Sequence, residues 1–225
     1  MRSRFLNASL LGLTLALGAA PLPAGAAGTE HQARQLDHSA AHAPCLSPAA
    51  VKLQGDMRRL WLDHVNLTRD YIVSAVAGTP DQEAILARLL QNQQDIGNAV
   101  KPFYGEEAGN KLAALLKEHI ELAGKILVAS KAGDAAEAEK QTKLWYRNGD
   151  DIVAFLTKAN PKLSAKELHD LFYRHLSMVA DALTARLKQD WAGDMTALDK
   201  GENHIVILAD FLTDGIVKQF PRRFK

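Results

Sequence analysis

Apolar residues recur at steps of three and four from residue 49 onward, and no stretch alternates with a period of two. This pattern is typical of amphipathic helices, so we predict an all-α protein. One face of the first predicted helix, residues 49–77, carries Leu53, Met57, Leu60, His64, Leu67 and Tyr71. A later predicted helix, residues 107–132, shows the same kind of stripe.

Residues that break or cap helices divide this region into six predicted helices. The breaks are, in chain order, Gly78, Pro102, Gly133-Asp134, Asn160-Pro161, Gly193-Asp194 and Pro221. We expect Thr79 to cap the second helix, and the sequence Ser164-Ala165-Lys166-Glu167 has the form of a capping box for the fifth. The short connections predict an up-and-down bundle.

An internal repeat runs through these helices. The segments 60–65, 115–120 and 171–176 share a local pattern in which His64, His119 and His175 follow one another at intervals of 55 and 56 residues. Asn92 and Asn148 begin a second shared pattern, and the third copy leaves either His204 or Asp210 opposite His175. We therefore predict three repeated helical hairpins within one domain, residues 49–225.

The repeated histidines lie where leucine is expected, near the middle of their helices. In an up-and-down bundle the odd-numbered helices run in the same direction, so their midpoints lie at one height. Asp95, Asp151 and His204 are also nearer the middle than the ends of their helices. We expect these side chains to form a polar layer inside an apolar core.

Two interpretations of this layer remain open. In the favoured one, each histidine is hydrogen-bonded to polar side chains of the paired helix. In the other, a divalent metal such as zinc, manganese or iron is bound. The candidate metal ligands are His64, His119, His175 and His204, and the candidate ligand-binding residues are Gln91, Asn92, Asp95, Asn148 and Asp151. Their spacing lacks the Glu-x-x-His form of helix-based metal sites.

Three tyrosines also fit two roles. Tyr71, Tyr104 and Tyr146 have the positions of cavity-lining residues, although aromatic side chains at helical spacing more often contribute to packing. The polar run 91–95 is unusual inside a helix, and we expect part of it to face neighbouring helices.

The composition limits the classes of function. The chain has 225 residues, 27 Lys and Arg, 26 Asp and Glu and a formal net charge of +1, which provides no electrostatic surface for nucleic acid. A single cysteine excludes a disulfide framework. With 47% hydrophobic and 24% charged residues, the composition is that of a globular protein.

The N-terminal region predicts export. Residues 1–26 have the basic start, apolar stretch and small residues of a signal peptide, with cleavage near Ala26. We expect residues 27–48 to form a disordered arm. Its His31, His38 and His42 have two interpretations, a weak metal site and incidental residues of a solvated tail, and their spacing favours the tail. A periplasmic or secreted protein follows, with no membrane span in the mature chain.

Several motifs resemble a bacterial family of small helical proteins. They are, in chain order, Arg88-Leu89-Leu90-Gln91-Asn92, Asp95-Ile96-Gly97-Asn98-Ala99, Lys101-Pro102-Phe103-Tyr104-Gly105, Leu115-Leu116-Lys117 with His119-Ile120, Trp145-Tyr146 with Asn148 and Asp150, and Gly215-Ile216-Val217-Lys218-Gln219-Phe220-Pro221. The resemblance covers nearly everything from about residue 53 onward. The family is functionally uncharacterised, and its members often carry automatic labels such as glycosyltransferase or acetylglutamate kinase. This sequence supports neither label, because it has no phosphate loop and no strand–glycine-loop–helix unit.

These observations favour an exported, non-enzymatic helical bundle. Its polar layer would bind a metal or a small ligand, or the bundle would act as a scaffold. The alternative is a metal-dependent enzyme, a hydrolase or an oxidase, that uses the same layer. The sequence identifies neither a particular small ligand nor a protein partner.

Overall fold

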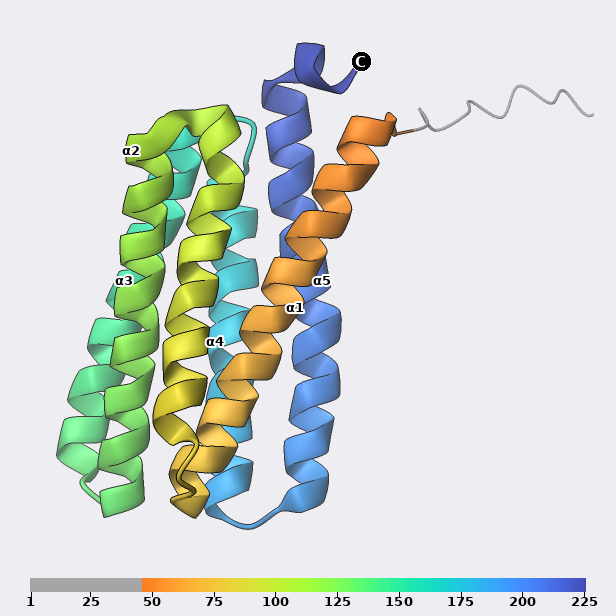
Figure 1. The fold of residues 1–225 in the computed structure, drawn as a ribbon. Coiled ribbons are helices and arrows are strands. Elements are labelled where there is room, and N and C mark those ends of the chain that lie inside the picture. Colours follow the sequence, from red (N-terminus) through yellow and green to blue (C-terminus); the bar gives the residue numbers. More distant parts are fainter. Residues whose placement is uncertain (1–45) are drawn as a thin grey trace, which may run out of the picture. The chain divides into compact units, whose positions relative to one another are not determined.

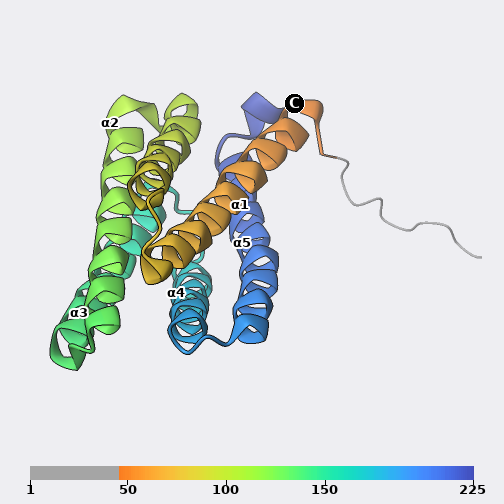
Figure 2. The same ribbon diagram turned by 60° about the horizontal axis from the view of Figure 1, so that its bottom comes forward.

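The computed structural model describes residues 46–225, and this part of the chain is built from α-helices (Figure 1). The elements are, in chain order, α1 (Pro48–Ala77), α2 (Gln82–Ala132), α3 (Ala135–Ala159), α4 (Ala165–Leu187), α5 (Trp191–Gln219) and the short 3₁₀ helix η1 (Pro221–Phe224). Residues 46–225 contain no β-strand, so the predicted all-α class is confirmed. The helices pack side by side and alternate in direction (Figures 1 and 2). The predicted leader, residues 1–26, and nearly all of the predicted arm lie outside the described residues.

The number of helices differs from the prediction: residues 46–225 contain five α-helices and not six. Pro102 lies inside α2 and does not end it. The chain turns instead at Gly105, which has φ of 85° and ψ of 170°, a backbone conformation open essentially to glycine alone. The segments 82–104 and 106–132 therefore lie antiparallel within the element α2 (Figure 1).

Two glycines bring these segments of α2 into close contact. A Cβ atom added to Gly97 would lie 2.5 Å from the backbone oxygen of Gly109, and one added to Gly109 would lie 2.6 Å from the backbone oxygen of Gly97. Real Cβ atoms do not approach an oxygen this closely. The missing side chains at both positions therefore permit backbone-to-backbone packing.

Most helix limits follow the local signals in the sequence. The Ser164 hydroxyl accepts a hydrogen bond from the backbone N–H of Glu167 at 3.3 Å, which confirms the predicted cap. Two caps differ. Asp81 takes the cap position of α2 where Thr79 was expected. In α5, Asp190 accepts from the backbone N–H of Gly193 at 2.8 Å, so the helix begins at Trp191, before the predicted break.

The core consists of two groups of buried side chains. The larger group extends through all five helices and includes Met57, Ile96, Leu116, Phe172 and Ile205. The smaller group lies where the C-terminal ends of α1 and α4 meet α2. Its members are Tyr71, Ile72, Ala75, Leu89, Ile120, Leu127 and Leu183. None of the helices in residues 46–225 combines the length and apolar character needed to cross a membrane.

Candidate functional site

Four histidines lie close together in the core, and we call them the histidine layer. They are His64 on α1, His119 on α2, His175 on α4 and His204 on α5, with exposed fractions between 2% and 5%. The ring centroids of His64 and His175 are 5.4 Å apart. The ring of Phe172 lies near two of these histidines, with its centroid 5.8 Å from that of His119 and 6.3 Å from that of His175. The structure thus places all four candidate histidines in the interior.

A similar hydrogen bond lies beside three of these histidines. The donors are Asn92 Nδ2, Asn148 Nδ2 and His204 Nε2, and the acceptors are the backbone oxygens of Leu60, Leu115 and Leu171, at 3.0, 3.2 and 2.8 Å. Each acceptor lies four residues before His64, His119 or His175. His204 thus takes the place that asparagine has in the other two contacts. Asp210, the other candidate, forms an ion pair with Arg58 at 2.6 Å.

The hydrogen bonds of Asn148 define the protonation of His119. A backbone oxygen only accepts, so the amide nitrogen of Asn148 must face Leu115 and its oxygen must face the ring. His119 Nδ1 lies 2.8 Å from Asn148 Oδ1 and therefore carries the proton. Burial lowers the pKa of His119 to about 3, the Asn148 hydrogen bond opposes this shift, and repulsion from His64 adds to it. The ring is neutral at pH 7.

The neighbouring His64 has fewer partners. Burial lowers its pKa to about 4, an effect that the nearby Gln93 amide partly offsets. Gln93 Nε2 donates to the backbone oxygen of Leu89 at 2.8 Å and to Asn92 Oδ1 at 3.0 Å. No hydrogen bond of adequate geometry reaches His64 Nδ1 or Gln93 Oε1 from the described residues.

His175 and His204 are also neutral at pH 7. Burial lowers the pKa of His175 well below its usual value, and repulsion from the three other layer histidines lowers it further. Burial lowers the pKa of His204 as well; its bond to Leu171 opposes this shift and the Arg174 charge reinforces it. The layer is therefore a buried group of neutral imidazoles without a carboxylate partner, in which His119 and His204 are hydrogen-bonded.

The predicted carboxylates do not join the histidine layer, which corrects that part of the prediction. Asp95 is half-exposed, accepts from Gln91 at 3.0 Å and lies 3.6 Å from Arg88, while Asp151 is exposed. Each follows its inward-facing asparagine by three residues. Three residues of an α-helix rotate the side chain about 60° from the starting direction. Gln91 is exposed too, so only Asn92 and Asn148 of the five candidate ligand-binding residues are buried.

The donor set does not fit a metal ion. Within residues 46–225, no group of three or more His, Cys, Asp or Glu side chains is arranged to hold one. A closed zinc site needs four ligands and a catalytic site needs three. The Nδ1 atom of His119 is already hydrogen-bonded to Asn148, and His204 Nε2 is bonded to a backbone oxygen. The geometry therefore does not support the alternative in which the histidine layer binds a metal.

An apolar pocket between the helices was not predicted as a site. We call it the α1–α4 cavity: it lies among α1, α2, α3 and α4, and its volume is about 190 Å³. It lies where α3 and α4 move apart toward the start of α3 and the end of α4 (Figures 1 and 2). Its apolar wall includes Tyr71, Ile72, Leu89, Ile120, Leu127 and Leu183. These are six of the seven residues of the smaller core group, so that group surrounds empty space.

Two tyrosines of this cavity were predicted from the sequence as possible cavity-lining residues. Tyr71 and Tyr146 both line it, as one of their two expected roles required. Trp145 lies in the same wall, and its ring centroid is 5.0 Å from that of His119. The cavity is therefore adjacent to the histidine layer through one side chain.

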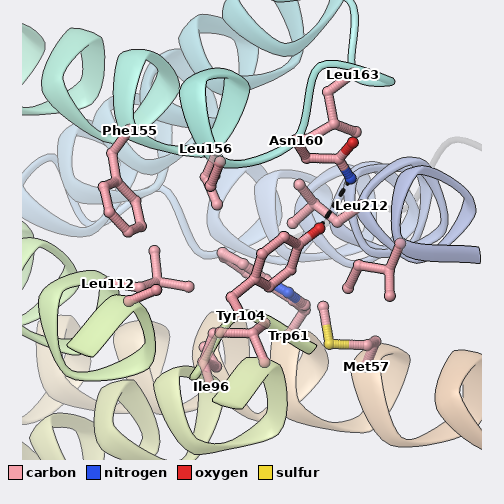
Figure 3. A pocket seen from close by; sticks show the side chains of 14 residues that line it. Met57, Trp61, Ile96, Tyr104, Leu112, Phe155, Leu156, Asn160, Leu163 and Leu212 are labelled. Carbon is pink, nitrogen blue, oxygen red and sulfur yellow. Dashed lines mark hydrogen bonds between the residues drawn. The ribbon is translucent and has the colours of Figure 1, made fainter. Parts of the chain in front are cut away.

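A second pocket, shown in Figure 3, is lined by residues of the larger core group. Tyr104 points across it toward Asn160, and Trp61 and Met57 close one side (Figure 3). The Tyr104 hydroxyl accepts from Asn160 Nδ2 and donates to Gln219 Oε1, both at 2.9 Å, and burial raises its pKa to about 12. The volume is about 30 Å³, room for one or two water molecules. This pocket is a small packing gap bridged by hydrogen bonds.

Comparison with known proteins gives no match: no family model, no curated protein and no solved structure is similar to this chain. The class of protein is therefore defined by its own fold and site, a helical bundle with a buried histidine layer and an adjacent apolar cavity.

Proposed function

We propose that this protein is a non-enzymatic binding protein whose ligand is a small, largely apolar molecule. The observation that carries this proposal is the α1–α4 cavity, with its volume of about 190 Å³ and its apolar wall. Ligand sites in proteins are mostly apolar hollows with a few polar groups.

The volume suits a single ring. An engineered apolar cavity of about 150 Å³ in another protein stays dry and binds benzene. A cavity of about 190 Å³ accommodates a monocyclic aromatic or alicyclic compound of slightly larger size. Two of the hydroxyls in its wall already have partners in their own helices: Thr68 donates to the backbone oxygen of His64 at 2.7 Å and Thr142 to that of Ala138 at 2.8 Å. Trp145 Nε1, by contrast, is a buried donor in this wall without a partner among the described residues.

The wall also favours binding over catalysis. Among the described residues that line the cavity there is no histidine, carboxylate, lysine or cysteine. The serine, threonine and tyrosine hydroxyls that line the cavity need an adjacent general base to act as nucleophiles, and the wall supplies none. The histidine layer lies behind Trp145, where it supports the wall of the site.

Two sequence-based expectations extend the proposal. The bundle consists of three related hairpins, and the three hydrogen bonds to Leu60, Leu115 and Leu171 support this relationship. The protein is exported, with a leader in residues 1–26. Fractionation of cells that produce the full chain tests export: a product that retains residues 1–26 in the cytoplasm contradicts it.

A filling substitution tests the binding proposal. Ala123 is half-buried in the wall, and Ala123→Leu places a larger side chain in the hollow. We expect fluorobenzene to bind the wild-type protein in calorimetric titration, and to bind A123L at least about tenfold more weakly. The matched control is Ala154→Leu at an exposed position on α3, which should bind as the wild type does. Absence of fluorobenzene binding to the wild-type protein contradicts the proposal.

A further inference from the structure

A wide groove opens on the surface next to the α1–α4 cavity, and we call it the α2 groove. Its volume is about 600 Å³, and it is lined by residues of both segments of α2 and of the start of α3. Its apolar wall includes Leu86 and Leu90 from the first segment and Val128 from the second. Val128 is 61% exposed, so an apolar side chain faces solvent at this place.

The Tyr71 side chain reaches from α1 to the α2 groove. Its ring lines both the groove and the cavity. Its hydroxyl end lies beside Gly124, because a Cβ atom added to Gly124 would lie 3.4 Å from Tyr71 Oη and 3.9 Å from Tyr71 Cε1. Gly124 is a residue of the groove wall, whereas its neighbour Ala123 belongs to the cavity wall. The Tyr71 hydroxyl therefore lies at the groove.

This hydroxyl lacks a partner in the described part of the chain. Tyr71 is 8% exposed, yet no hydrogen bond within residues 46–225 involves its Oη atom. The Tyr104 hydroxyl, by contrast, donates to Gln219 and accepts from Asn160. Buried tyrosine hydroxyls usually have such partners, because an unsatisfied polar group costs free energy when it leaves water. Tyr71 Oη is thus a polar group that a ligand in the groove can satisfy.

Packing alone does not require glycine at position 124. The Cβ atom of an alanine, 3.4 Å from Tyr71 Oη, would be in ordinary van der Waals contact. Alanine also favours a helix more than glycine does. A side chain at position 124 would, however, cover the Tyr71 hydroxyl. Glycine therefore suits a hydroxyl that remains accessible from the groove.

The charges around the groove favour an uncharged group at this hydroxyl. The charged residues that line it are Glu121, Lys125, Asp134 and Glu137. Glu137 accepts from Lys140 at 3.0 Å and from Gln141 at 2.6 Å, and Asp134 accepts from the backbone N–H of Glu137 at 3.0 Å. A charged headgroup beside Tyr71 would lose hydration without gaining a counter-ion. A hydroxyl or carbonyl group needs only a hydrogen bond, which the tyrosine hydroxyl supplies as donor or acceptor.

We propose that the α2 groove is a separate binding site, whose ligand is an uncharged amphiphile with an apolar chain and a hydroxyl or carbonyl head. The chain lies along Leu86, Leu90 and Val128, and the head is hydrogen-bonded to Tyr71 Oη beside Gly124. This site goes beyond the function proposed for the α1–α4 cavity and does not depend on it.

Removal of the hydroxyl tests the contact. We expect 1-octanol to bind the full chain in calorimetric titration, and Tyr71→Phe to weaken this binding at least about threefold, because one hydrogen bond is lost. Tyr146→Phe is the matched control, since Tyr146 is a residue of the cavity wall and its loss of a hydroxyl should leave the affinity unchanged. Equal affinities of Y71F and the wild type overturn the inference, as does absence of 1-octanol binding to the wild type.

Two larger side chains distinguish the groove from the cavity. Gly124→Leu covers the Tyr71 hydroxyl and should weaken 1-octanol binding at least about tenfold. Ala123→Leu fills the cavity and should leave 1-octanol binding unchanged while it weakens fluorobenzene binding. Weaker 1-octanol binding in A123L would place the probe in the cavity and overturn the inference. Y71F provides the same test of the groove without a larger side chain.

Headgroup preference tests the ligand class. We expect 1-octanol to bind at least about threefold more tightly than octanoate and octyltrimethylammonium at pH 7.5, and Tyr71→Phe to reduce this preference. Equal or tighter binding of either charged amphiphile overturns the uncharged class.

Discussion

His119 Nδ1 and Asn148 Oδ1 lie 2.8 Å apart and join α2 to α3 inside the core. The amide of the same asparagine donates to the backbone oxygen of Leu115 at 3.2 Å. One side chain therefore satisfies the Nδ1–H of a neutral imidazole and sets the register of two helices, while His119 Nε2 has no partner among the described residues. This pairing explains how a histidine is accommodated where a leucine is expected.

Loss of this pair should destabilise the bundle. Asn148→Ala leaves the Nδ1–H of His119 without its partner in a buried position, and an unsatisfied buried donor costs about 1–3 kcal/mol. Asn98→Ala is the control, because Asn98 is exposed and should change the free energy of unfolding by less than about 0.5 kcal/mol. Urea unfolding measures both, and equal effects would contradict the role of Asn148.

Acidification should destabilise the folded protein. Histidine has a pKa of 6.5 in the unfolded chain, whereas burial lowers the pKa of His64 to about 4 and of His119 to about 3. Between these values the unfolded state binds protons that the folded state does not. Stability is therefore fully present above pH 6.5 and is lost as the pH falls below it. Repulsion from the other layer histidines also lowers the pKa of His175, and the charge of Arg174 lowers that of His204.

Urea unfolding at pH 7.5, 6 and 5 measures this loss. We expect a steadily falling free energy of unfolding, with an uptake of about one proton for each of His64 and His119 on unfolding near pH 5. His119→Gln should remove about one proton from that uptake. A free energy of unfolding that is the same at pH 5 and pH 7.5 would show that the imidazoles are not buried in neutral form.

Two glycines should respond oppositely to the same substitution. Gly97→Ala places a Cβ atom 2.5 Å from the Gly109 backbone oxygen and should destabilise the protein by about 2 kcal/mol or more, since the backbone cannot move aside. Gly55→Ala meets open space in α1 and should stabilise it by up to about 1 kcal/mol, through helix propensity. Thermal unfolding compares them; a stabilising G97A would contradict the close packing within α2.

A buried ion pair near the start of α5 should also be sensitive. Asp194 lies 2.8 Å from Arg69 and 3.0 Å from Arg186, and its side chain is 2% exposed. Asp194→Asn leaves two partly buried guanidinium groups without their counter-charge and should cost about 3 kcal/mol. Asp214→Asn breaks only an exposed pair with Lys218 and should cost less than about 0.5 kcal/mol. Similar losses in the two variants would contradict this difference.

Several features could be predicted because they depend on neighbouring residues in the chain. Gly78 and Gly133 end helices in left-handed conformations, and Ser164 caps the next helix. The break predicted at Pro102 was wrong: proline weakens a helix locally, yet Phe103 and Tyr104 continue it until Gly105 permits the turn. The inward position of the histidines followed from helical periodicity in the same way.

The sequence by itself determined the helical class, most helix limits and the burial of His64, His119 and His175, because these depend on a period of 3.6 residues and on local backbone chemistry. The tertiary structure alone decided which polar groups meet the imidazoles. It placed Asn148 against His119 and left Asp151 in solvent, a difference of about 60° around one helix. It also determined the presence and position of the α1–α4 cavity, since the separation of α3 and α4 depends on contacts among helices far apart in the chain.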